Sequence, residues 1–357
     1  MNNLFLYLLF ITIGVLGMYL MYKPQINKYE QTLNLSYLVL PLPYIYGLYA
    51  LGSLVAYFIS ENTDFIETLT FTRMIVPLIL APVVYAAGIF LSERMAFVTT
   101  IACVALTVWL QPIGDGNSYP EIPVWSLRLL IFIFASIYCL GGIVQNFLPH
   151  TLLVPKMVFL FGLIMMAIFG ACPAYAALSA AVLLGALGGY LSINFYEVKI
   201  EIDDAAAIAI SYMVCSLLLL NVGELCLPSC IILTSVFWAE LIVALCRRYF
   251  IIRAGSLAES TNYYAAAQVL TVKGLTQGML KICGIMMFIS WFQLYSVNGY
   301  SLLIVSLLVA LWLNNSISLP NGGKQTLKEI NQNFVTDLKQ NISEAKEALN
   351  RGRKDDE

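Results

Sequence analysis

Charged residues are scarce in this chain of 357 residues. Asp, Glu, Lys and Arg make up only 11% of it, whereas apolar residues make up 60%, and the mean hydropathy is +0.81. A soluble domain has about 25% charged and about 45–50% apolar residues. A soluble fold of this composition would expose large apolar patches, so the scarcity of charge excludes an ordinary soluble protein. No strongly basic segment is present to indicate a nucleic-acid partner.

The sequence also lacks the alternation of apolar and polar residues that is typical of membrane barrels. Its apolar runs are unbroken over about 18–22 residues, the length of a spanning helix, and in lipid only helices and closed barrels satisfy their own backbone. We therefore predict an all-α polytopic membrane bundle in direct contact with the lipid bilayer. It would have about eleven transmembrane helices, near residues 4–22, 37–59, 74–91, 95–111, 126–145, 151–170, 174–195, 205–225, 231–246, 278–296 and 301–317.

The first apolar run, Leu4 to Tyr22, has no basic leader and no small-residue cleavage site after it. We interpret it as a retained helix rather than a signal peptide. Basic residues gather in every second predicted loop, which marks the cytoplasmic side. The sequence thus predicts an outside N-terminus, a cytoplasmic C-terminus and a multi-pass location in the cell (inner) membrane. The loops on the cytoplasmic side contain Lys23, Lys28, Arg94, Lys199, Arg247, Arg248, Arg253 and Lys273.

Composition changes near residue 320, which divides the chain into a transmembrane domain, 1–319, and a polar tail, 320–357. Apolar residues recur in the tail every three or four positions, which predicts an amphipathic helix. That helix would lie on the protein or the membrane, or it would pair with a second copy, giving a homodimer, or with a partner membrane enzyme. The apolar stripe consists of Leu327, Ile330, Phe334, Leu338, Ile342, Ala345 and Leu349.

Two local features have a structural explanation. Cys226 and Cys230 flank a proline turn. A disulfide could form between them if that turn faces an oxidising compartment. The stretch from Leu183 to Gly189 contains three glycines, and close packing of helices accounts for it without any nucleotide site.

Three predicted cytoplasmic segments carry a family resemblance. In the first, Asn194, Phe195, Lys199, Ile200 and Asp204 stand in register. This segment resembles the N-F-P-P-A-K-I-F-M-G-D-x-G-S loop of the polyprenyl-phosphate N-acetylhexosamine-1-phosphate transferases. That family includes phospho-N-acetylmuramoyl-pentapeptide transferase and undecaprenyl-phosphate N-acetylglucosamine phosphotransferase. Both prolines of the loop, and the glycine and serine around its aspartate, are missing here.

The second segment contains Glu240, the pair Arg247-Arg248, and Arg253-Ala254-Gly255-Ser256. It resembles the family's acidic residue, its R-R pair and its R-x-G-x-S-P-F run, and Gly274-Leu275-Thr276 resembles the G-L-S that follows. The D-R-x-H-x-H-H cluster of the family is replaced by residues 260–268, which contain no histidine.

In the third segment, Asn146 matches the first residue of the family's N-L-I-D-G-L-D-G, but Pro149 and Leu152 replace its aspartates. Upstream, Leu91 and Ser92 replace a second aspartate pair, with Glu93 adjacent.

The resemblance implies transfer of a sugar phosphate from a uridine nucleotide to undecaprenyl phosphate, with Mg²⁺ bridging the phosphates. It implies Asp203 and Asp204 as metal ligands, and a lipid-phosphate or substrate site formed by Lys199, Asn194, Arg247, Arg248 and Glu240. Each has a simpler alternative. The aspartates would cap the next helix, and the basic residues would be positive-inside anchors.

Three functional hypotheses follow. The first is a catalytically degenerate transferase homologue that binds polyprenyl phosphate or serves a partner enzyme in cell-envelope synthesis. The second is a divergent but active transferase that uses Asp203, Asp204 and Glu93. The third is an unrelated transporter or flippase. Because intramembrane charges are costly, Lys156 and Glu240 are expected to face inward in a functional or paired role, or Lys156 to reach the cytoplasmic interface. His150, the only histidine, is interpreted as structural.

Overall fold

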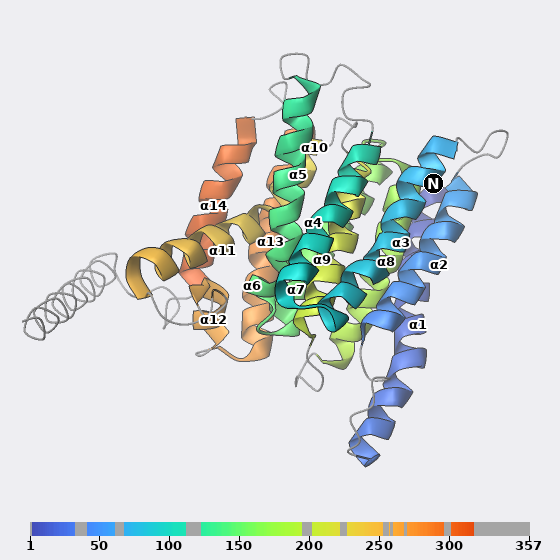
Figure 1. Ribbon diagram of the computed structural model, residues 1–357, viewed down its shortest axis with the longest axis horizontal. Helices are drawn as coiled ribbons and strands as arrows, with labels where there is room; N and C mark the ends of the chain where they lie inside the picture. Colours follow the sequence, from blue (N-terminus) through green and yellow to red (C-terminus); the bar gives the residue numbers. More distant parts are fainter. Residues whose placement is uncertain are drawn as a thin grey trace, which may run out of the picture.

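The computed structural model describes residues 2–32, 41–60, 68–111, 123–194, 202–221, 227–252, 257, 260–267, 270–295 and 301–317. These residues form a bundle of helices without strands (Figure 1). Lys199, Cys226, Arg253 and the tail 320–357 lie outside the described residues, so the predictions on them stay predictions. The helices are α1 Asn2–Thr32, α2 Leu42–Ser60, α3 Thr68–Phe90, α4 Glu93–Leu110, α5 Val124–Leu140, α6 Gly142–Gln145, α7 Pro149–Ile168, α8 Ala174–Ile193, α9 Asp204–Leu219, α10 Leu227–Leu233, α11 Ser235–Cys246, α12 Asn262–Ala267, α13 Val272–Leu294 and α14 Ser301–Ile317.

Eight of the described helices are long and apolar enough to cross a membrane, and the bent pair α10–α11 would be a ninth. Two further apolar helices, α9 and α14, are shorter. The prediction of a helical, multi-pass membrane protein is therefore confirmed, while the count of eleven and the orientation stay predictions. The predicted ends differ most at α1, which continues to Thr32 through a polar segment. Hydropathy follows the thickness of lipid, and polar residues can continue a helix beyond it.

The predicted continuous helix 231–246 is instead broken. A bend of 50° separates α10 from α11, which runs obliquely to most other helices in Figure 1. Thr234 lies at the break, where its hydroxyl donates to the carbonyl oxygen of Ile231 at 2.7 Å and accepts from Trp238 Nε1 at 3.2 Å. Side-chain hydrogen bonds of this kind interrupt the backbone ladder of a helix. An apolar pattern alone does not show such a break.

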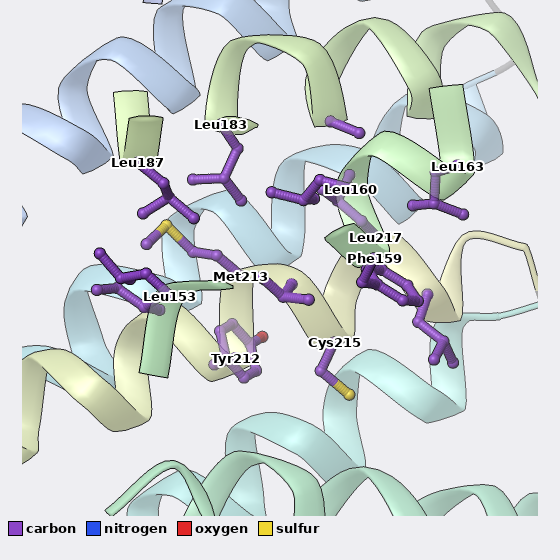
Figure 2. Packing of buried hydrophobic residues seen from close by; sticks show 14 of the residues in the cluster. Leu153, Phe159, Leu160, Leu163, Leu183, Leu187, Tyr212, Met213, Cys215 and Leu217 are labelled. Carbon is purple, nitrogen blue, oxygen red and sulfur yellow. The ribbon is translucent and has the colours of Figure 1, made fainter. Parts of the chain in front are cut away.

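The centre of the bundle consists of α8 and α9. Both are apolar on all sides, as expected for helices without a broad exposed face. Most residues of α8 and nearly all residues of α9 are buried. Around α8 pack α1, α2 and α7, whereas α3, α4, α5 and α6 pack around α9. Figure 2 shows where α7, α8 and α9 meet, through Leu153, Phe159, Leu160, Leu163, Leu183, Leu187, Tyr212, Met213, Cys215 and Leu217.

Glycines bring α1 and α8 into backbone contact. A Cβ atom on Gly185 would lie 2.3 Å from the carbonyl oxygen of Ile11, and one on Gly14 would lie 2.6 Å from that of Val182. Close helix packing, predicted from the glycine-rich stretch, is therefore confirmed at Gly185. Gly188 differs, because the nearest atom to its Cβ would be the flexible end of Met157 at 3.4 Å.

These two glycines make a matched pair for mutation. Gly185→Ala is expected to destabilise the protein by about 1–3 kcal/mol, because α1 must move away from α8. Gly188→Ala is expected to be neutral or to stabilise by up to about 1 kcal/mol, since alanine is the better helix former. Unfolding in mixed micelles measures both. Equal effects of the two substitutions would contradict the packing of α1 on α8.

Candidate functional site

One hydrogen-bonded contact joins two of the segments that resemble transferase loops. Asn146 follows α6, and its Nδ2 donates to Asp204 Oδ1 at 2.9 Å and to the carbonyl oxygen of Ile202 at 2.7 Å. The two side chains are far apart in sequence, yet they lie together at the N-terminal end of α9. Asn146 was not among the predicted binding residues. Its match to the first residue of the family's N-L-I-D-G-L-D-G motif could have indicated it.

Asp203 occupies the N-cap position of α9 with extended backbone, but its side chain makes no capping hydrogen bond. Its Oδ1 is buried without a hydrogen-bond partner among the described residues, and Tyr85 on α3 interacts with it electrostatically. Burial raises the pKa of this carboxyl, the charge of Asp204 adds to the increase, and the backbone amides of Asp203 and Ala206 oppose it. A nearby cation would favour its ionised form. Asp204 itself is exposed in the first turn of α9.

An apolar cavity of about 200 Å³ lies between α2, α3 and α9. Tyr85 lines the cavity and also interacts with Asp203. Tyr46, Ala209 and Met213 line it further along. A polar end at the aspartates and an apolar cavity beside them suit an amphipathic molecule rather than a free ion.

Glu240 is buried on α11 and holds the first turn of α12. Its Oε2 accepts hydrogen bonds from the backbone N–H groups of Asn262 at 2.9 Å and Tyr263 at 3.4 Å. Arg247 donates to Asn262 Oδ1 at 2.5 Å and, through its other terminal nitrogen, to the Ser260 carbonyl oxygen at 3.4 Å. Glu240 and Arg247 thus hold the backbone of residues 260–263 in place. The expected inward-facing, paired state of Glu240 is what the structure shows.

Two further contacts place α12. The ring of Tyr264 lies 5.6 Å from that of Phe147 between centroids, edge to face, and Tyr263 Oη lies 2.9 Å from Asn314 Oδ1 on α14. Phe147 adjoins Asn146, so the second and third segments also meet. All three segments that carry the resemblance are therefore in contact through residues 146 and 147.

A buried lysine lies behind this contact. Lys156 on α7 is only 1% exposed, and its Nζ donates to Gln145 Oε1 at 3.1 Å and lies 5.7 Å from the ring centroid of Tyr138. The inward, paired interpretation of Lys156 is confirmed, and the alternative that it reaches the interface is wrong. His150 is also fully buried, in the first turn of α7.

The remaining predicted residues are more dispersed. Arg248 is exposed on the π-helix Arg247–Ile252. Asn194 is buried at the C-terminus of α8, where its Nδ2 donates to the Tyr190 carbonyl oxygen of the same helix at 3.2 Å. Glu93 is exposed at the start of α4.

Within the described part of the chain, no group of three or more His, Cys, Asp or Glu could hold a metal ion. Asp203 and Asp204 would suit Mg²⁺ only together with oxygen atoms of a bound phosphate, as magnesium sites with few carboxylates do.

Comparison with known proteins adds no relative. No family model matches the sequence, and no curated protein matches it at a significant level. The resemblance to the transferases therefore rests on the loop residues given above.

Glu240 offers a direct test of how α12 is held. Glu240→Ala would leave two backbone N–H groups buried without an acceptor, and we expect a loss of about 1–3 kcal/mol in unfolding free energy. We also expect faster tryptic cleavage after Arg247, because its partners Ser260 and Asn262 are released.

The control is Glu93→Ala, which removes an exposed carboxylate and should change stability by about 0.5 kcal/mol or less. If Glu240→Ala resisted trypsin as well as the unaltered protein does, the capping role of Glu240 would be wrong.

Proposed function

We propose that this protein is a non-catalytic relative of the polyprenyl-phosphate N-acetylhexosamine-1-phosphate transferases and binds undecaprenyl phosphate in the cell membrane. It would act in cell-envelope synthesis as a lipid-binding or partner subunit. The observation that carries this proposal is the assembly of three distant segments: Asn146 bonds to Asp204, and Phe147 packs on Tyr264. Those segments are the ones whose residues resemble the family's loops.

The chemistry beside this contact suits a lipid phosphate. The apolar cavity between α2, α3 and α9 would take the first part of an isoprenoid chain. Asp203 and Asp204 would repel a phosphate unless a cation lay between them, so Mg²⁺ is proposed to accompany the phosphate. Arg248 is exposed, and with Lys199 it would supply the positive charge that attracts an anionic headgroup.

The substitutions in the sequence favour binding without catalysis. Pro149, Leu152 and Leu91 stand where the family has aspartates. In the segment that replaces the histidine cluster, Asn262 and Tyr263 are used to fix α12 through Glu240 and Asn314. Few groups are left there to hold a metal-bound nucleotide.

The proposal includes the eleven-span topology. Eleven crossings result if the bent pair α10–α11 counts once and the shorter helices α9 and α14 each cross. With the charge bias of the loops, the N-terminus would be outside, and the Asn146–Asp204 contact would face the cytoplasm. That side is where undecaprenyl phosphate meets soluble nucleotides.

The test is thermal stabilisation of the purified full-length protein by undecaprenyl phosphate in nanodiscs, with and without Mg²⁺. We expect stabilisation that weakens at least tenfold in apparent affinity when Lys199 and Arg248 are both replaced by Gln. Arg247 is left in place, because it donates to Asn262 and to the Ser260 carbonyl. The control is Lys273→Gln, which removes an exposed cation from the first turn of α13.

Equal binding by the double variant would reject this site. Single-turnover transfer of label from UDP-sugars to the lipid provides the second criterion. Mg²⁺-dependent product that disappears with Asp204→Asn would show that the protein is a divergent active transferase instead.

A further inference from the structure

A separate cavity of about 590 Å³ opens between the C-terminal end of α4 and the N-terminal end of α5. Trp109, Trp125 and Phe132 form its walls, and Arg128 is the charged residue among those that line it. Both indoles are largely exposed, at 69% and 71%. The cavity lies at the opposite end of α5–α6 from Asn146, so it is distinct from the proposed polyprenyl-phosphate site (Figure 1).

Arg128 is held in place but not neutralised by the described residues. Its guanidinium carbon lies 5.2 Å from the ring centroid of Trp109, which fixes the planar group against an aromatic face. Its Nε is buried and has no hydrogen-bond partner in the described part of the chain. A buried donor without an acceptor is costly. Among the residues that the structure describes, the site therefore offers this donor no anionic acceptor.

The surroundings indicate where that acceptor comes from. Trp109 lies at the end of one apolar helix and Trp125 at the start of the next. Tryptophan at helix ends is typical of the membrane–water interface, where lipid headgroups lie. The guanidinium is a fork of donors that matches phosphate oxygens in pairs. The apolar walls would contact the glycerol and upper acyl carbons of the same molecule.

We propose that this cavity, the Trp109–Arg128 cavity, binds the phosphate headgroup of an anionic phospholipid. Arg128 donates to the phosphate oxygens, Trp109 orients the guanidinium, and Trp125 with Phe132 covers the start of the acyl chains. A free phosphate would gain only the polar half of these contacts, so a membrane lipid is the occupant. Neither the resemblance to transferases nor the proposed polyprenyl-phosphate binding is needed for this site.

The probe is phosphatidylglycerol, and the readout is its retention by the full-length protein in native mass spectrometry after delipidation and titration. The unaltered protein is expected to keep one tightly held phosphatidylglycerol. Arg128→Gln should weaken that binding at least tenfold, Arg128→Lys by less, and Trp109→Leu by an intermediate factor. The matched control is Arg94→Gln, which removes an exposed arginine from the other end of α4 and should change binding less than twofold.

Three results would overturn the proposal. One is unchanged retention in the Arg128→Gln variant, provided that circular dichroism shows it to be folded. The second is an equal loss of lipid retention in the Arg94→Gln variant, which would mean that the lipid binds through general positive charge rather than at this cavity. The third is displacement of the lipid by millimolar sn-glycerol 3-phosphate, which would make a soluble phosphate the occupant.

Discussion

The structure depends on the deep burial of α8 and α9 within a bundle of helices. Because lipid offers no hydrogen bonds to the backbone, each segment must satisfy its own amides as a helix, and packing alone then decides the arrangement. Gly14 and Gly185 bring α1 against α8 at backbone distance. Small residues also bring α6 against α9, since a Cβ on Gly142 would lie 2.8 Å from the Ala207 carbonyl oxygen. This second contact fixes the end of α6, and so the position of Asn146.

The candidate site follows from that packing. With α6 fixed on α9, Asn146 reaches Asp204 and the Ile202 carbonyl oxygen, and the neighbouring Phe147 meets Tyr264 on α12. Glu240 and Arg247 complete the arrangement by holding residues 260–263. Asn146, Glu240 and Arg247 are thus engaged with neighbouring backbone and side chains, whereas Asp203 Oδ1 has no hydrogen-bond partner among the described residues.

The sequence predicted the class of fold and the approximate helices, because unbroken apolar length is a strong signal. It missed the bend at Thr234, which arises from side-chain hydrogen bonds rather than from polarity. At the site, it placed Asp203 and Asp204 correctly at the start of a helix, but it did not show that Asn146 pairs with Asp204 or that Glu240 caps α12. Such contacts join residues 58 and 22 positions apart, and periodicity carries no information on pairs at that separation. The cavity at Arg128 is likewise formed between α4 and α5, and the apolar sequence of each helix alone does not indicate it.

The central claim is that the three resembling segments lie together on one side of the membrane. Paired cysteines test it most directly, in a variant whose reactive native thiols are replaced: Asn146→Cys with Asp204→Cys, and Phe147→Cys with Tyr264→Cys. Both pairs should cross-link rapidly with a short bismaleimide in cell membranes, and a membrane-impermeant thiol reagent applied from outside should block neither. The pair Asn146→Cys with Arg128→Cys, at opposite ends of α5–α6, should not cross-link. Failure of either first pair to cross-link, or protection by the external reagent, would contradict the account.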